Sequence, residues 1–292
     1  MNKLINIIML IRPHYWSKNL IIFVPFFANK NESFEIFINL LVGLFIFCLV
    51  SSIGYIFNDI SDVKNDKKHL YKKNRPIANN SINIKEALTL IFLLLLITVL
   101  LLYIFSNIYF SSIILIYLIG TFIYSVIVKK IFLLDIILIS IFFILRIEAG
   151  SAIIKVDSSI WLISYSLLFF LSLSSLKRIA EVINFNELDE ISFLRKNYTG
   201  NTLLPLIILS IVCHFISCII LYNYINSDKV LSLYNEHIYL YLTIPLLTIW
   251  YSLLTFRIIK YKINVDPIVF TLKDKFSYII LTLIILIVYI SY

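Results

Sequence analysis

The sequence predicts an all-α, polytopic membrane protein of about nine transmembrane helices, and two observations support this fold class. First, hydrophobic residues make up 61% of the 292 residues, only 14% are charged, and the mean hydropathy is +0.95. No soluble domain of this length is expected to have such a composition. Second, the apolar runs are repeatedly about 18 to 25 residues long, enough for a helix to cross a hydrocarbon core of about 30 Å.

The predicted spans follow one another along the whole chain, so we expect a single integral membrane domain over residues 1–292. The first span is the shortest and contains Pro25. The N-terminal region has an apolar stretch but no cleavage site of small residues, so it is not interpreted as a removed signal peptide. The expected spans lie near residues 15–29, 34–57, 84–106, 108–128, 131–150, 158–177, 202–225, 236–256 and 274–291.

The basic residues predict the orientation. With the N-terminus in the cytoplasm, 21 of the 25 lysines and arginines fall on the cytoplasmic side, all except Lys30, Arg146, Lys155 and Lys229. This asymmetry is what the positive-inside rule describes. We therefore expect a multi-pass protein of the cell's inner (plasma) membrane, with its N-terminus and its charged loops in the cytoplasm.

The formal net charge of +8 belongs to this cytoplasmic face, where it can attract anionic lipid headgroups and anionic substrates. Nucleic acid is not an expected partner, because the charge is spread over loops and no recognition module is present. The group Cys213, His214 and Cys218 lies inside a predicted apolar span, where ordinary packing is favoured over a metal site.

The most informative segment is an aspartate-rich run from Asn58 to Asp66, which follows the second span directly. If the run is helical, Asp59, Asp62 and Asp66 lie within about 60° of one another on one face. Three like charges repel one another, and a divalent cation relieves the repulsion. Oxygen ligands favour Mg²⁺, which binds through carboxylates and substrate phosphates. The alternative is a solvated cytoplasmic loop whose acids balance its lysines.

Charged residues also occur at the junction of two predicted spans and inside one of them, where charge is costly. Tyr124, Lys129 and Asp135 lie at the junction of the fourth and fifth spans, although Lys129 also suits an ordinary interfacial anchor. Arg146 lies within the fifth span, where an arginine costs about 2.5 to 3.5 kcal/mol unless it faces protein or a polar cavity. The alternative is that Arg146 reaches the far interface and snorkels there.

These residues resemble a known family. The run Asn58-Asp59-x-x-Asp62-x-x-x-Asp66 is similar to the first aspartate-rich motif of the UbiA prenyltransferase superfamily, whose members are nine-helix membrane enzymes. Within it, the chain resembles the branch typified by decaprenyl-phosphate phosphoribosyltransferase. That resemblance rests on Arg12-Pro13-x-x-Trp16-x-Lys18-Asn19, His69-x-x-Lys72-x-x-Arg75-Pro76-Ile77-Ala78, Tyr124 with Lys129 and Asp135, Arg146 with Gly150, Lys177-Arg178-x-x-Glu181, and the segment from Asp266-Pro267 to Lys273-Asp274.

The sequence departs from the family pattern at two places. Leu70 stands where the branch usually has proline, which we expect to alter a turn. Members that use prenyl diphosphates carry a second aspartate-rich motif before the seventh helix. Here that loop offers Lys177, Arg178 and Glu181, while its later acids Glu187, Asp189 and Glu190 lack the required spacing. Cations in that place suit a substrate phosphate bound without metal.

The resemblance therefore implies an Mg²⁺-dependent transferase that moves a 5-phosphoribosyl group from phosphoribosyl pyrophosphate to a polyprenyl phosphate, a step of cell-envelope biosynthesis. In this interpretation Asp59, Asp62 and Asp66 are the catalytic and metal-binding residues. The implied substrate-binding residues are Asn58, Lys18, Lys72, Arg75, Tyr124, Lys129, Asp135, Arg146, Lys177, Arg178 and Glu181.

Two alternatives stay open. One is a prenyltransferase of the same fold, which would move a polyprenyl chain from its diphosphate to an aromatic acceptor. The other is a carrier or flippase for polyprenyl lipids, which would tolerate neutralised carboxylates. The sequence leaves open whether the chain forms a homo-oligomer.

Overall fold

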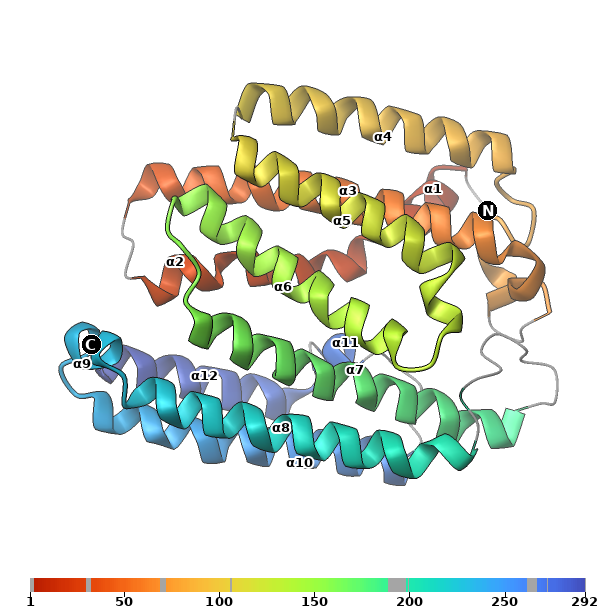
Figure 1. Ribbon diagram of the computed structural model, residues 1–292. Helices are drawn as coiled ribbons and strands as arrows, with labels where there is room; N and C mark the ends of the chain where they lie inside the picture. The colour runs from red at the N-terminus through yellow and green to blue at the C-terminus, as the bar shows by residue number, and fades with distance from the viewer. Residues whose placement is uncertain are drawn as a thin grey trace. The chain divides into compact units, whose positions relative to one another are not determined.

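The computed structural model describes residues 3–29, 33–68, 72–105, 107–188, 198, 200–261, 267–271 and 273–291. All regular elements in these ranges are helices, which confirms the predicted all-α class (Figure 1). The described residues fall into two compact units, one within Met1–Ser158 and the other from Ser159 onwards. A single domain over residues 1–292 stays a prediction.

The first unit is built around one long helix, α3, which contacts α1, η1, α4, α5 and α6. Figure 1 shows α3, α4, α5 and α6 running side by side. A buried apolar cluster that includes Phe47, Phe110 and Ile114 joins α3 to α5. The elements are α1 (Lys3–Ile11), η1 (Pro13–Phe23), α2 (Val24–Ala28), α3 (Phe34–Asp66), η2 (Lys72–Asn74), α4 (Ile84–Phe105), α5 (Ile108–Val126), η3 (Val128–Lys130) and α6 (Leu134–Ile154).

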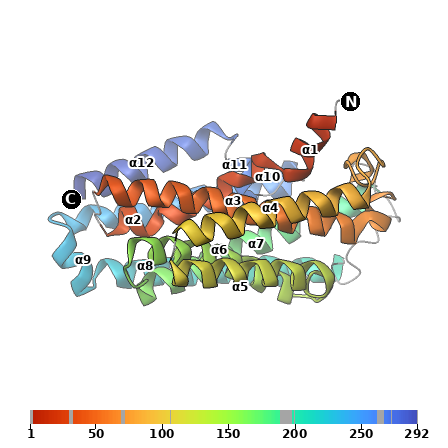
Figure 2. The same cartoon turned by 90° about the horizontal axis from the view of Figure 1, so that it is seen from above.

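The second unit packs α7 closely against α8, and α10 contacts both of them as well as α12. Figure 2 shows the same elements from above. Trp250 Nε1 donates a hydrogen bond of 3.1 Å to Ser277 Oγ and so joins α10 to α12. The elements are α7 (Ile160–Leu188), η4 (Gly200–Thr202), α8 (Leu203–Ile225), α9 (Asp228–Leu233), η5 (His237–Leu242), α10 (Thr243–Tyr261), α11 (Pro267–Thr271) and α12 (Lys275–Ser291).

Within the described ranges, seven helical segments are long and apolar enough to cross a membrane. They lie at Phe34–Asp66, Ile84–Phe105, Ile108–Val126, Leu134–Ile154, Ile160–Asn184, Gly200–Ile225 and His237–Tyr261. The shorter apolar helix α12 matches the ninth predicted span. The multi-pass prediction is confirmed, whereas the count of nine is not.

The first predicted span, residues 15–29, is not one continuous α-helix. It is the 3₁₀ helix η1 followed by the five-residue helix α2. Two local features suit a broken path: Arg12 before η1 has a left-handed backbone with φ of 57°, and Pro25 lacks a backbone N–H. Packing adds a third, because α6 approaches this segment at Gly150. A Cβ at Gly150 would lie 2.0 Å from the carbonyl oxygen of Ile22.

The second predicted span ends too early at residue 57. Helix α3 continues without interruption to Asp66, so the aspartate-rich run is helical rather than a loop. The run contains neither proline nor glycine, so nothing in its local sequence stops the helix. Deeper in α3, Gly54 allows α5 to approach, since a Cβ there would lie 3.2 Å from the Thr121 side chain. This approach brings the α5–α6 connection towards the end of α3.

Candidate active site

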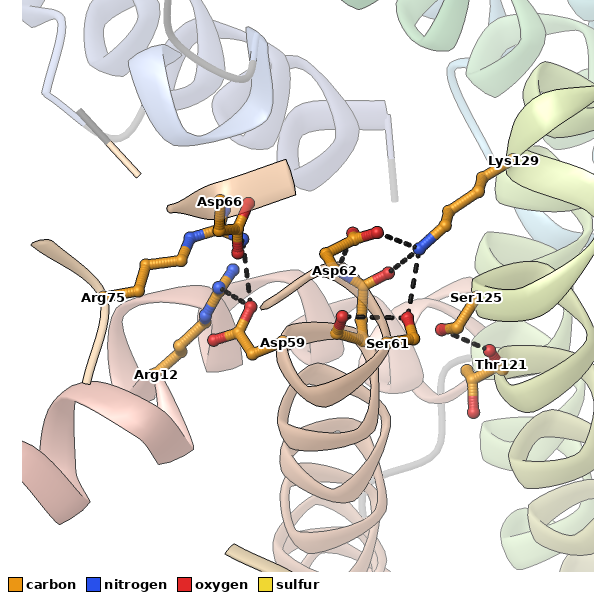
Figure 3. Close-up of polar contacts among 10 residues, drawn as sticks. Arg12, Asp59, Ser61, Asp62, Asp66, Arg75, Thr121, Ser125 and Lys129 are labelled. Carbon is orange, nitrogen blue, oxygen red and sulfur yellow. Dashed lines mark hydrogen bonds and ion pairs between the residues drawn. The ribbon is translucent and has the colours of Figure 1, made fainter. Parts of the chain in front are cut away.

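Three carboxylates lie on the last two turns of α3, in the first unit. Asp59 and Asp66 are each 2% exposed, and Asp62 is half-buried. Figure 3 shows cations approaching these acids from two sides, with Arg12 and Arg75 on one side and Lys129 on the other. Buried carboxylates lose the hydration that stabilises their charge, so each needs a cation or a hydrogen-bond donor.

Arg75 joins two of the acids. Its Nη1 lies 3.0 Å from Asp59 Oδ1 and 2.7 Å from Asp66 Oδ2, so one guanidinium nitrogen bridges two successive turns of α3. Arg75 follows η2 on the connection between α3 and α4. A cation between the two carboxylates offsets the repulsion that the shared helix face creates. The structure thus brings the predicted residues Asp59, Asp66 and Arg75 together.

Arg12 reaches Asp59 from the junction of α1 and η1, and its Nη2 lies 2.5 Å from Asp59 Oδ1. Burial by itself would lower the pKa of Arg12, but the charge and hydrogen bond of Asp59 outweigh burial and raise that pKa overall. The sequence places Arg12 in the family-like motif without assigning it a role at the site. Its position next to Pro13, where an apolar helix ends, is the signal that could have selected it.

Lys129 holds the remaining acid. Its Nζ donates to Asp62 Oδ1 at 2.6 Å, to Ser61 Oγ at 3.1 Å and to Asn58 Oδ1 at 3.2 Å. Asn58 Nδ2 also donates to Asp62 Oδ2 at 3.1 Å. Lys129 is only 8% exposed and bonded to three groups of α3, which favours a role in the site over that of an ordinary interfacial anchor. Ser61 was not predicted, although it lies one turn from Asn58 on the same helix.

The three acids and the three cations Arg12, Arg75 and Lys129 have equal and opposite formal charge. We call these six residues the aspartate cluster. Within the described ranges, the acids, histidines and cysteines form no group of three that could hold a metal ion as they stand. One observation nevertheless fits a cation: Asp66 Oδ1 is buried and has no hydrogen-bond partner in the described part of the chain. Oxygen donors of this kind suit Mg²⁺.

Other predicted residues of the first unit lie on neighbouring elements. Lys18 lies on η1 with its Nζ 5.1 Å from the centre of the Tyr15 ring, and Lys72 begins η2. The Tyr124 ring on α5 is 6.1 Å from that of Phe142. Asp135 is completely buried in the first turn of α6.

Arg146 is buried inside the first unit, so the interpretation that it snorkels at the far interface is wrong. Its guanidinium donates to Asn19 Oδ1 at 2.8 Å, to the Phe142 carbonyl at 2.6 Å and to Tyr117 Oη at 2.8 Å. The Tyr117 ring also lies 5.0 Å from the guanidinium carbon, close enough for a cation–π interaction. These contacts tie η1, α5 and α6 together.

The predicted residues Lys177, Arg178 and Glu181 were expected in a loop after the sixth span, but that prediction is wrong, because α7 continues to Leu188 and carries all three in the second unit. Arg178 is completely buried and donates from Nη1 to Glu181 Oε2 at 2.5 Å. Its guanidinium carbon also lies 5.9 Å from the centre of the Tyr198 ring.

His214 packs in the second unit against an aromatic ring. Its imidazole stacks on Tyr251 with ring centres 3.9 Å apart. Several predicted elements lie outside the described residues, namely His69, Leu70, Asp189, Glu190, Asp266 and the side chain of Glu187.

Comparisons with known proteins agree with this architecture. The family model described as the UbiA prenyltransferase family matches residues 20–181, more than half of the chain. A solved structure of a UbiA homologue from Archaeoglobus fulgidus, bound to GPP and Mg²⁺, superposes with a TM-score of 0.70 and covers 97% of this chain and 99% of that chain. Its sequence identity of 17% supports the fold alone.

Two curated relatives are similar in sequence. An uncharacterised protein of Sinorhizobium fredii, y4nM, is 30% identical over 274 residues, which are 92% of this chain and 52% of the relative. A decaprenyl-phosphate phosphoribosyltransferase of Corynebacterium glutamicum is 28% identical over 181 residues, which are 59% of this chain and 53% of the relative. The chain thus spans about half the length of the curated relatives it matches.

Proposed function

The chain belongs to the UbiA prenyltransferase family, and from that premise we propose that it transfers a 5-phosphoribosyl group from phosphoribosyl pyrophosphate to a polyprenyl phosphate. The observation that carries this proposal is the aspartate cluster, in which three acids of one helix meet cations from three other segments. Carboxylates hold a metal on a pyrophosphate, while arginine and lysine bind phosphate oxygens directly. The similarity to a decaprenyl-phosphate phosphoribosyltransferase points to the same substrates.

The proposed metal-binding residues are Asp59, Asp62 and Asp66. Among their oxygens, Asp66 Oδ1 is buried and accepts no hydrogen bond from the described part of the chain, so it is available to a metal ion. When bound there, Mg²⁺ would neutralise negative charge on the departing pyrophosphate. Arg75 bridges two of these acids and, once they bind the metal, can turn its donors to phosphate oxygens. Lys129 orients Asp62, and Arg12 orients Asp59.

The reaction needs no strong general base. The bond between the anomeric carbon and the pyrophosphate oxygen breaks, and pyrophosphate leaves with the electron pair. An oxygen of the already anionic lipid phosphate then bonds to the anomeric carbon, so a phosphate monoester becomes a diester. In the first unit, Lys129 and Tyr124 are proposed to bind the lipid phosphate. The resemblance adds Lys177 and Arg178 of the second unit as further substrate-binding residues. Asn58, Lys18, Lys72, Asp135, Arg146 and Glu181 complete the proposed substrate-binding set.

The orientation of the site is part of the proposal. Helix α3 carries the three acids of the aspartate cluster at its C-terminal end, beside the basic connection to α4. The positive-inside rule assigns that connection to the cytoplasm. A water-soluble sugar donor made in the cytoplasm would then reach the site directly, while the polyprenyl tail stays in the inner membrane.

A second candidate is prenyl transfer from a polyprenyl diphosphate to an aromatic acceptor. It is favoured by the similar fold of the Archaeoglobus fulgidus homologue that was solved with GPP and Mg²⁺. It would use the same acids and the same metal, with a prenyl diphosphate in place of the sugar donor. Against it stands the sequence from Lys177 to Glu190, the last part of α7 and the two residues after it, which lacks a second aspartate-rich motif.

A direct assay separates the two candidates. The purified protein in detergent is given Mg²⁺, labelled phosphoribosyl pyrophosphate and a polyprenyl phosphate, and the parent is compared with Asp62→Asn and with the control Asp228→Asn. Asp228 begins α9, in the second unit. We expect labelled lipid from the parent and the control but not from Asp62→Asn. Failure to form it, together with prenylation of 4-hydroxybenzoate from a polyprenyl diphosphate, would establish the second candidate.

A further inference from the structure

The first unit contains a cavity of about 1010 Å³ at the opposite end of its helices from the aspartate cluster. The start of α3, the end of α4, the start of α5 and the end of α6 line it, together with residues 155–158. Val42 in its wall and Asp62 are both on α3, 20 residues apart, which corresponds to about 30 Å along the helix. The cavity is therefore separate from the proposed reaction site.

Three charged side chains line this cavity: Glu148, Lys155 and Asp157. Glu148 Oε1 is buried and has no hydrogen-bond partner among the residues that the structure describes. A carboxylate oxygen in that position is costly in a membrane helix unless a ligand satisfies it. Glu148 thus points to a bound group that donates hydrogen bonds or carries positive charge.

Lys155 and Asp157 lie in a short connection that is tied to the end of α6. The Val156 N–H donates to the Ser151 carbonyl at 3.1 Å, and the Ser151 and Ser158 hydroxyls are 2.7 Å apart. Lys155 itself takes a left-handed backbone with φ of 56°, which ends α6 and turns the chain. The connection thus places Lys155 and Asp157 beside the end of α6 that carries Glu148, and all three residues line the cavity.

The remainder of the lining is mostly apolar and includes Val42, Leu101, Phe105 and Ile153. Ile104 and Ile108, which also line the cavity, are each 76% exposed. Exposed apolar side chains at the ends of membrane-crossing helices can contact lipid, so this edge of the cavity is suited to an acyl chain. A polar end and an apolar wall of this kind match an amphiphile with a charged headgroup and an acyl chain.

We propose that this cavity binds a zwitterionic phospholipid with a primary ammonium headgroup, of the phosphatidylethanolamine class. Glu148 and Asp157 accept hydrogen bonds from the ammonium group, Lys155 binds the phosphate, and an acyl chain lies along the apolar wall. The three side chains carry a net charge of −1, which disfavours an anionic lipid, including a polyprenyl phosphate. The proposal concerns the leaflet opposite the aspartate cluster and does not depend on the reaction proposed above.

Native mass spectrometry of the full chain in detergent tests this. Dioleoylphosphatidylethanolamine, dioleoylphosphatidylcholine and dioleoylphosphatidylglycerol are titrated separately, and the dissociation constant of the first bound lipid is measured. We expect the ethanolamine lipid to bind about fivefold more tightly than the other two, because only it offers N–H donors without net charge. Glu148→Gln should weaken its binding about tenfold, whereas the exposed control Glu236→Gln should not change it.

Asp157→Asn is a second test of the proposal, in case Glu148→Gln does not fold. Asp157 is exposed, so its substitution should not prevent folding. We expect this variant to reduce the preference for ethanolamine over choline. Equal binding of all three lipids, tighter binding of the glycerol lipid, or unchanged ethanolamine affinity in the carboxylate variants would each overturn the proposal. Transferase activity of the parent is measured on the same sample, and ethanolamine-lipid binding by a parent without transferase activity would count against the reaction proposal alone.

Discussion

Replacing Lys129 with methionine tests whether a buried ion pair holds Asp62. The Lys129 Nζ lies 2.6 Å from Asp62 Oδ1, and the two side chains are only 10% and 13% exposed. Removing one partner of a buried pair costs about 3 to 5 kcal/mol, because the other charge stays buried without its counterion. The partial exposure places this pair at the lower end of that range. We therefore expect Lys129→Met to lower the free energy of unfolding by about 3 kcal/mol.

A double-mutant cycle isolates the pair itself. Asp62→Asn alone should cost about 2 kcal/mol, since the ammonium group keeps its neutral partners Asn58 and Ser61. The double variant should cost about 2 kcal/mol as well, because neither charge is then left unpaired. These values leave a coupling energy of about 3 kcal/mol between Asp62 and Lys129.

The assay is unfolding by sodium dodecyl sulfate in mixed micelles, followed by circular dichroism. Lys130→Met serves as the matched control, because Lys130 is the exposed neighbour of Lys129. This control should change the free energy of unfolding by less than about 0.5 kcal/mol. If Lys129→Met were as mild as Lys130→Met, or if the two single effects simply added, the buried-pair argument would be refuted.

Three other perturbations have expected outcomes. Gly150→Ala should destabilise the protein by about 2 kcal/mol in the same unfolding assay, because the added Cβ would clash with the Ile22 carbonyl oxygen. Gly200→Ala is the control and should be neutral, because a Cβ there would have no atom within 4 Å. Arg146→Met removes three buried hydrogen bonds and should lower the free energy of unfolding by about 2 kcal/mol, at about 0.6 kcal/mol per bond. An unchanged free energy of unfolding would show that these bonds contribute nothing. The third concerns Asp274, before α12: burial alone would raise its pKa, but hydrogen bonds from an arginine and a serine outweigh burial and lower the pKa in the folded state. Its contribution to stability should therefore be complete above about pH 4 and be lost as the pH falls through the lowered pKa, so Asp274→Asn should flatten that part of a pH–stability curve.

The aspartate cluster shows where inference from the sequence succeeds. The helical spacing of Asp59, Asp62 and Asp66 is a local property, so the prediction of one shared face needs only the rise and twist of an α-helix. The choice of Arg75 follows from the family-like motif, because it lies only nine residues beyond Asp66. The pairing of Asp59 with Arg12, 47 residues away, has no comparable local signal.

One wrong prediction and one open alternative have a shared physical cause. Residues 15–29 were expected to form a transmembrane helix, but the segment is divided between η1 and α2, where α6 packs closely at Gly150. Arg146 could not be assigned to the protein interior or to the far interface, because hydropathy treats every face of a helix alike. Both outcomes depend on which neighbouring element approaches, and that information is spread over the chain.

By itself, the sequence determined that this is an all-helical, multi-pass membrane protein of the UbiA prenyltransferase family with acids on one helix face. Composition, run length and helical period are enough for the membrane class and the shared face, since each is set by the local chain and by the thickness of the bilayer, whereas the family rests on the motifs. Only the tertiary structure decided that Lys129, rather than a neighbouring lysine, neutralises Asp62 across 67 residues of sequence. The reason is that a buried charge is stabilised by whatever the fold brings within about 3 Å of it, and distance along the chain does not predict that partner.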